Sequence, residues 1–170
     1  MKNFNNKNIV ISVAASILVI GGAVWYAGLK PADNQPAGQN TGGALAAEES
    51  SFDFGVISMA AGEVSHSFKI KNSGGGPVVV NKIYTSCMCT TAILNKGGNK
   101  SGPFGMPGHG SATRLKETIG PGEEAEIEVV FDPAAHGPEG TGLIKRVVYA
   151  ETDSEAAPKF QLTFEANVTP

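Results

Sequence analysis

Two cysteines separated by one residue are the side chains best placed for chemistry in this sequence. Cys87 and Cys89 are the only thiols in the chain. If the apolar run at 78–85 continues through them as a strand, both sulfurs point to the same face. Their Cα atoms would then be about 6.5 Å apart, at the long end of disulfide geometry, so a disulfide there is expected to be strained.

Two thiolates on one face can instead bind a soft metal ion. Copper(I) and zinc both accept thiolate ligands, although two ligands are only half of a tetrahedral zinc site. The glycine-rich stretch at 97–110 adds two soft or borderline donors, Met106 and His109, on a loop that can fold over the strand end. Met88 and His136 are more distant candidates. The predicted metal ligands are Cys87, Cys89, Met106 and His109.

The cysteine pair has other interpretations that the sequence leaves open. A buried cysteine usually packs as a small apolar side chain, and a pair in an exported protein usually forms a disulfide. Thiol exchange is a further use, although the CxC spacing differs from the CxxC of thioredoxin-like sites. A possible Cys87–Cys89 disulfide, a metal site and a redox pair are therefore competing hypotheses.

No recognisable catalytic motif accompanies the cysteines. The sequence lacks GxSxG, Walker and HExxH patterns, so we expect no enzymatic activity. The net charge of −3 gives no basic surface for phosphate groups, and a nucleic-acid partner is not expected. His66 shares an apolar strand face, which predicts a hydrogen-bonded core histidine rather than a ligand.

Alternating apolar and polar residues define the elements that must position these side chains. Side chains of a strand point alternately to opposite faces, so the alternation predicts half-buried strands. No stretch after Ser51 has a convincing helical period. About seven short strands in residues 51–170 predict an all-β, immunoglobulin-like antiparallel β-sandwich. The predicted strands are 52–57, 64–71, 78–85, 91–94, 125–131, 143–152 and 160–168.

Several motifs in this region resemble one bacterial family, the domain of unknown function 1573. The most specific is Thr85-Ser86-Cys87-Met88-Cys89-Thr90, which is similar to the family signature T-S-C-x-C-T. The resemblance covers most of residues 52–168. It implies a Hydin-like, immunoglobulin-type sandwich that is usually exported, with no established activity. The other matching segments are 52–57, 62–63, 66–74, 77–80, 121–123 and 131–133.

Two features depart from the family pattern. The residue between the cysteines is usually glycine in the family, and here it is Met88. The stretch 95–118 is longer than usual and begins with a glycine-rich sequence, which predicts an inserted loop. Any chemistry of this loop is therefore expected to be peculiar to this chain.

The N-terminal segment predicts a membrane anchor. Residues 9–29 contain no charged residue or histidine, and a helix of that length spans the roughly 30 Å hydrocarbon core of a bilayer. Lys2 and Lys7 precede this run, which predicts a cytoplasmic stub at 1–8 and a folded domain outside the plasma (inner) membrane. A cleaved signal peptide is the alternative, but the apolar run is longer than such peptides use.

Residues 30–50 are rich in proline, glycine, alanine and amides, which predicts a flexible linker. With this arrangement, the expected function is a non-catalytic interaction or structural module of the cell envelope. Its expected partners are the membrane and an unknown envelope protein or wall component. The alternative is a soft-metal, copper(I) or zinc, or thiol-redox domain that uses the cysteine pair.

Overall fold

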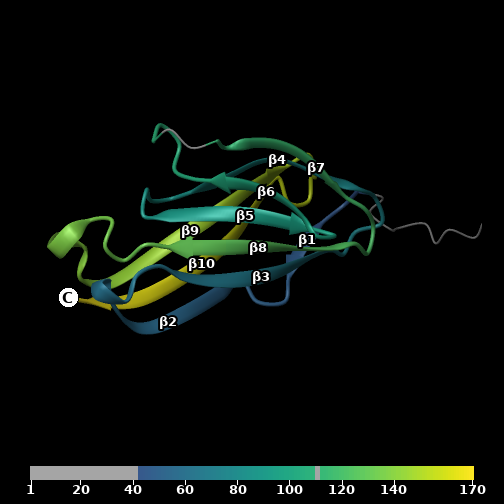
Figure 1. Ribbon diagram of the computed structural model, residues 1–170. Helices are drawn as coiled ribbons and strands as arrows, with labels where there is room; N and C mark the ends of the chain where they lie inside the picture. The colour runs from purple at the N-terminus through teal and green to yellow at the C-terminus, as the bar shows by residue number, and fades with distance from the viewer. Residues whose placement is uncertain (1–41, 110–111) are drawn as a thin grey trace, which may run out of the picture. The chain divides into compact units, whose positions relative to one another are not determined.

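The folded domain is a sandwich of two five-stranded β-sheets (Figure 1). The computed structural model describes residues 42–109 and 112–170. The first sheet has the order β1-β3-β8-β5-β6, and the second has the order β2-β10-β9-β4-β7. The first sheet contains β1 (Leu45–Ala47), β3 (Val64–Asn72), β8 (Glu124–Phe131), β5 (Thr90–Lys96) and β6 (Asn99–Phe104). The second contains β2 (Ser51–Ser58), β10 (Lys159–Thr169), β9 (Gly142–Thr152), β4 (Val78–Thr85) and β7 (Arg114–Ile119).

Side chains from the inner faces of both sheets form one core. The alternation in β3 places Phe68 and Ile70 inside, both almost fully buried. In the second sheet, the alternation in β10 buries Phe164 in the same way, and its ring lies 5.3 Å from that of Phe131 of β8. His66 stacks on Phe52 and its Nε2 lies 2.6 Å from Glu49 Oε1, so the predicted hydrogen bond is present. The side chain is half-buried beside the core rather than within it.

All seven predicted strands are confirmed, and the all-β architecture with them. Three further strands lie where loops were predicted. β1 lies in the range 30–50, so the flexible linker is wrong for residues 45–47, which pair with β3. β6 and β7 lie in the range 95–118, which is therefore not a simple loop: β6 forms a hairpin with β5, and β7 is an edge strand beside β4.

The sandwich is not wholly antiparallel. β2 pairs with β10 in parallel, and the register between them shifts by one residue at Gly55. Gly55 has a φ of +69°, a conformation that favours glycine, and this bulge adds a residue to β2. As a result Val56 pairs with Asn167 and points outward, although the simple alternation from Phe52 and Phe54 would place it inside.

The predicted anchor at 9–29 lies outside the described residues. Within 42–109 and 112–170, no helix has the length and apolar character needed to cross a membrane. The two helical segments in this part of the chain are single 3₁₀ turns, η1 (Met59–Ala61) and η2 (Gly137–Gly140).

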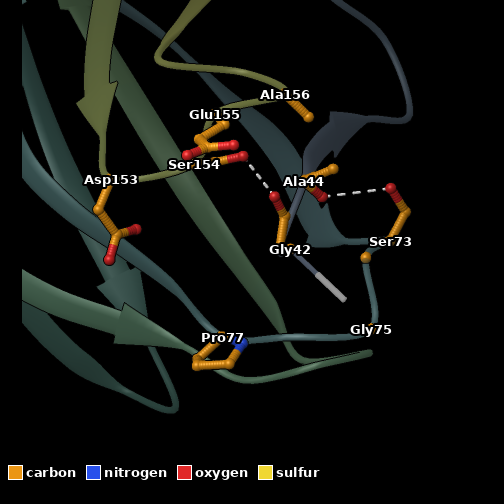
Figure 2. A pocket seen from close by; sticks show the side chains of 11 residues that line it. Gly42, Ala44, Ser73, Gly75, Pro77, Asp153, Ser154, Glu155 and Ala156 are labelled. Carbon is orange, nitrogen blue, oxygen red and sulfur yellow. Dashed lines mark hydrogen bonds between the residues drawn. The ribbon is translucent and has the colours of Figure 1, made fainter. Parts of the chain in front are cut away.

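The two ends of the sandwich differ in what they carry. At one end, here called the entry end, Leu45 pairs with Asn72 at the last residue of β3. Figure 2 shows this end, where the Ser154 hydroxyl donates to the carbonyl of Gly43 and the Ser73 hydroxyl donates to Ala44 O at 3.2 Å. The first described residues therefore join the sandwich beside the β3–β4 turn and the β9–β10 loop.

The opposite end, here called the cysteine end, holds the β4–β5 turn and the β8–β9 loop. Phe131, the last residue of β8, pairs with both Val64 at the start of β3 and Thr90 at the start of β5. Strands rise about 3.3 Å per residue, so the length of β3 separates the two ends by more than about 25 Å.

Candidate functional site

The cysteines lie in a tight turn rather than on a strand. β4 ends at Thr85, and Cys87 to Cys89 form the turn into β5. The buried Thr85 hydroxyl lies 2.9 Å from Cys87 O and 3.0 Å from Thr90 O, and these two hydrogen-bond contacts stabilise the turn. The extended conformation expected for Cys87 to Cys89 is therefore wrong. The backbone turns at these residues, and the hydrogen bonds of Thr85 stabilise the turned conformation.

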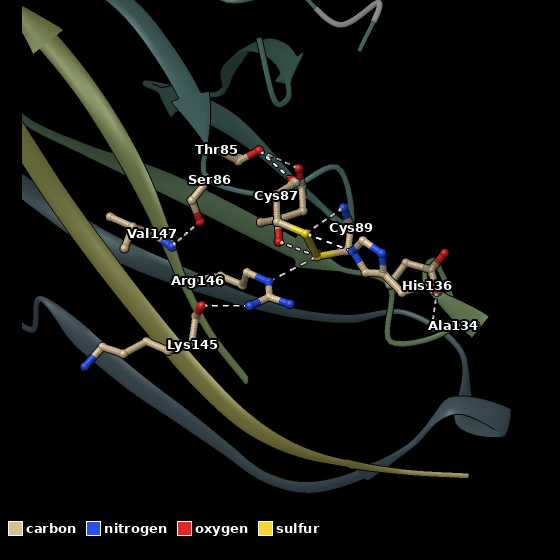
Figure 3. Close-up of a disulfide and its surroundings, with 11 residues drawn as sticks. Thr85, Ser86, Cys87, Cys89, Ala134, His136, Lys145, Arg146 and Val147 are labelled. Atoms are coloured by element: carbon tan, nitrogen blue, oxygen red, sulfur yellow. Dashed lines mark hydrogen bonds between the residues drawn. A yellow bond between two sulfur atoms is a disulfide. The ribbon is translucent and has the colours of Figure 1, made fainter. Parts of the chain in front are cut away.

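The turn brings the two sulfurs into a disulfide (Figure 3). The Cα atoms of Cys87 and Cys89 are 5.3 Å apart, shorter than the extended conformation allows and within the usual range for disulfides. Both residues are buried, at 9% and 3% exposure, whereas Met88 between them is 51% exposed. The turn thus places sulfur inside and an apolar side chain outside.

His136 approaches the disulfide from the β8–β9 loop. Its Nε2 lies 3.1 Å from Cys87 Sγ (Figure 3). The loop is held against the turn because Asp132 N donates to Cys89 O at 2.9 Å, while the Asp132 carboxylate accepts from Ala134 N at 2.8 Å. A backbone hydrogen bond therefore joins two segments that are far apart in sequence.

Arg146 completes the site from β9. Its Nε donates to Cys89 Sγ at 3.4 Å, and its Nη1 donates to the carbonyl of Lys145 at 2.9 Å. β4 leaves the sheet after Thr85, which pairs with Val148. Arg146 therefore lies at the cysteine end, beyond the last paired residue of β4, where its guanidinium can point toward the disulfide.

An open groove of about 420 Å³ runs beside these residues. His136 and Arg146 form part of its wall, so the groove reaches the groups that contact the sulfurs. Leu143, which is 87% exposed, also lines it. The larger hollow at the entry end, about 1000 Å³, is lined mainly by glycines and small polar residues (Figure 2). The cysteines are not among its lining residues.

The structure assembles a different ligand set from the predicted one. Among the described histidines, cysteines and acidic residues, the group whose ligand atoms lie within 4.8 Å of one another is Cys87, Cys89 and His136. His109 is exposed in the turn after β6, where its N donates to Met106 O at 3.2 Å, and it does not belong to this group.

Arg146 is the residue that the sequence interpretation missed. In β9, Val148 and Ala150 are buried, so residue 146 has the same parity as core positions. An arginine at a core-facing position of a strand needs a polar partner inside the fold. That parity is the signal that could have pointed to Arg146.

Large exposed apolar side chains also gather at the cysteine end. In the described part of the chain these are Val56, Met88 and Leu143, at 70%, 51% and 87% exposure. Leu143 and Val56 flank Asn167 on neighbouring strands, so the two side chains lie in one row on the outer face of the second sheet. They also line a common groove of about 440 Å³.

Comparison with known proteins confirms the family resemblance over part of the chain. Residues 45–104, which include the cysteine turn, match the family described as protein of unknown function, DUF1573. No curated protein matches this chain.

A solved structure shares the fold over most of this chain. A protein of unknown function from Porphyromonas gingivalis W83 is 19% identical, with a TM-score of 0.56, over 79% of this chain and 51% of that chain. This chain thus spans about half the length of that protein. The ASH/PapD-like domain 7 of human CEP192 is 12% identical, with a TM-score of 0.44, over 79% of this chain and 92% of that domain.

Proposed function

We propose that this protein is a non-catalytic interaction module of the cell envelope that binds a protein partner through its cysteine end. The observation that carries this proposal is that Val56 and Leu143 form an exposed apolar row at the cysteine end, where the exposed Met88 lies in the β4–β5 turn. Exposed apolar groups that cluster on one region favour a contact surface, whereas isolated ones need no explanation.

The position of this surface supports the proposal. Gly42, the first described residue, lies at the entry end, where Ala44 and Ser73 are joined by a hydrogen bond. If residues 9–29 anchor the chain in the plasma membrane, the domain is tethered through the entry end. The cysteine end then faces away from its own attachment point and is free to meet a partner in the envelope.

The shape of the surface favours an extended apolar contact rather than a small-molecule site. Leu143 lines both the groove with Val56 and the groove with His136 and Arg146, so the two hollows lie on either side of one exposed apolar side chain. Both are shallow and open, unlike the enclosed pockets that bury most of a small ligand.

The test is site-specific photo-cross-linking in the native host. A photoreactive amino acid replaces Leu143 in one full-length variant and Glu155, which is exposed at the entry end, in the matched control. We expect a discrete adduct from position 143 and none from position 155. A second change, Val56→Glu, is expected to reduce the adduct at 143 at least fivefold, because it places a charge in the apolar row. Equal adducts from both positions, or an adduct insensitive to Val56→Glu, would contradict the proposal.

A further inference from the structure

We propose that Cys87, Cys89 and His136 form a binding site for one copper(I) ion that opens when the disulfide is reduced. This site lies at the same cysteine end as the proposed partner surface, but it is read out by metal rather than by protein binding, so either proposal can fail without the other. The two sulfurs and the imidazole nitrogen lie within 4.8 Å of one another. Ligand atoms around one ion lie about 3.5–4 Å apart at bond lengths of about 2.0–2.3 Å. His136 Nε2 already lies 3.1 Å from Cys87 Sγ, and the two bonded sulfurs need only separate once the disulfide is reduced.

The donor set selects the ion. Two thiolates are soft ligands, which favour copper(I), and a single imidazole suits copper equally. Zinc in structural sites takes four ligands, and the described cluster of Cys, His, Asp and Glu side chains supplies three. A three-donor set rich in sulfur therefore fits copper(I) better than zinc.

The charge of the site leads to the same ion. Copper(I) with two thiolates and a neutral imidazole carries one net negative charge, whereas zinc with the same ligands is neutral. Arg146 Nε lies 3.4 Å from Cys89 Sγ, so its guanidinium can offset that negative charge. A fixed cation beside the sulfurs stabilises the copper(I) complex and gives no such advantage to the neutral zinc complex.

The surroundings suit a soft ion that must be shielded yet reachable. Both cysteines are buried, while His136 is exposed and lines the open groove. The ion can enter along the groove to His136 and then pass inward to the two sulfurs. His136 would thus serve as the outer ligand, and the cysteines as the inner ones.

Reduction of the disulfide acts as the gate. Breaking the S–S bond consumes two electrons and two protons and yields two thiols. An external dithiol supplies both and becomes a disulfide itself. Copper(I) then replaces the two thiol protons, which are released to solvent. The disulfide closes a loop of only three residues. A disulfide that closes a shorter loop stabilises the fold less, so we expect the fold to survive its reduction.

The test uses the full-length chain in detergent, reduced and kept anaerobic, and titrated with copper(I) against a chromophoric copper(I) chelator. We expect one copper(I) per chain in the reduced protein and none in the disulfide form. The double variant Cys87→Ser, Cys89→Ser is expected to lose binding altogether. His136→Ala is expected to weaken binding at least tenfold while two thiols remain titratable.

Matched controls distinguish this site from unspecific thiol binding. His109→Ala removes another exposed histidine and is expected to leave the copper(I) affinity within twofold of the original. Arg146→Gln removes the offsetting charge and is expected to weaken copper(I) binding but not zinc binding. The proposal fails if the His136→Ala and His109→Ala variants bind copper(I) equally well. It also fails if the reduced wild-type protein does not compete with the chelator for copper(I).

Discussion

The side chain of Asn72 links several backbone segments at the entry end by hydrogen bonds. It is fully buried, and its amide makes four hydrogen bonds to backbone groups. Its Nδ2 donates to Gly76 O at 2.8 Å and to Ile119 O at 2.9 Å. Its Oδ1 accepts from Ala44 N at 3.1 Å and Gly74 N at 3.0 Å. One side chain therefore joins backbone segments of both sheets.

Replacing this amide leaves backbone groups without partners. We expect Asn72→Leu to lower the free energy of unfolding by about 2–4 kcal/mol, because buried groups lose their hydrogen bonds. The measurement is equilibrium urea unfolding of the domain from residue 39, followed by circular dichroism. The matched control is Asn81→Leu, since Asn81 is exposed with one long hydrogen bond of 3.5 Å. Equal losses in the two variants would show that Asn72 has no special role.

At the scale of elements, Lys96 connects the end of β5 to β7 in the other sheet. Its Nζ lies 2.6 Å from Glu117 Oε1 and donates to Thr118 O at 2.6 Å. Glu117 occupies an inner-parity position of β7, between the half-buried Leu115 and the buried Ile119. The ion pair therefore allows a carboxylate to face inward near the edge of the sandwich.

The pH dependence of this contact can be predicted from the direction of one pKa shift. The hydrogen bond with Glu117 raises the pKa of Lys96 above its ordinary value of 10.5. The folded state therefore holds this proton more tightly than the unfolded chain. Its stabilising contribution is complete below pH 10.5 and is lost as the pH rises through the folded-state pKa.

We expect Lys96→Met to lower the free energy of unfolding by about 0.5–1 kcal/mol at pH 7, because the pair is partly exposed. The difference from the original domain should shrink at the alkaline end of a urea-unfolding series run upward from pH 7. Lys100→Met is the matched control, since Lys100 is more exposed and its ion pair with Glu128 joins β6 and β8 within one sheet. A Lys96→Met effect that stays constant over the whole series would contradict the assignment.

The bulge in β2 determines which apolar residue reaches the surface. Gly55 adds one residue opposite β10, and this turns Val56 outward and Ile57 toward the core. A bulge reverses the facing of every side chain beyond it. The exposed apolar row beside Leu143 therefore depends on one glycine conformation.

At the scale of the whole molecule, the first described residues and the cysteine turn lie at opposite ends of the sandwich. Ser154, just beyond the end of β9, donates a hydrogen bond to Gly43 O at the entry end. Leu143 is the second residue of β9 and lies at the cysteine end. The length of β9 between Leu143 and Thr152 corresponds to about 30 Å. A membrane-tethered domain would on average hold its cysteine end farther from the bilayer than its entry end.

This polarity can be measured after reconstitution of the full-length chain in vesicles. In a background with Cys87→Ser and Cys89→Ser, Leu143→Cys and Glu155→Cys each accept one fluorophore. We expect quenchers fixed in the lipid headgroups to reduce the emission from position 155 more than that from position 143. Equal quenching, or the reverse order, would contradict a tether through the entry end.

The sequence was sufficient for the features that depend on local periodicity. Seven strands could be predicted because core-facing residues such as Phe68 and Phe164 alternate with polar ones, and strand geometry requires that alternation. The cysteine pair could be identified from residue type and spacing, and the family resemblance holds over residues 45–104.

Only the tertiary structure decided which residues surround the cysteines. His136 is 49 residues from Cys87 in sequence, and Arg146 is 57 residues from Cys89. They meet because the start of β5, the end of β8 and the start of β9 all lie at the cysteine end of the sandwich. β6 and β7 were missed for a related reason: glycine and proline break the pattern in β6, and Glu117 breaks it in β7. Backbone pairing with β5 stabilises β6, and pairing with β4 together with the Lys96–Glu117 ion pair stabilises β7. Such contacts join residues far apart in sequence, so the local alternation of apolar and polar residues cannot reveal them.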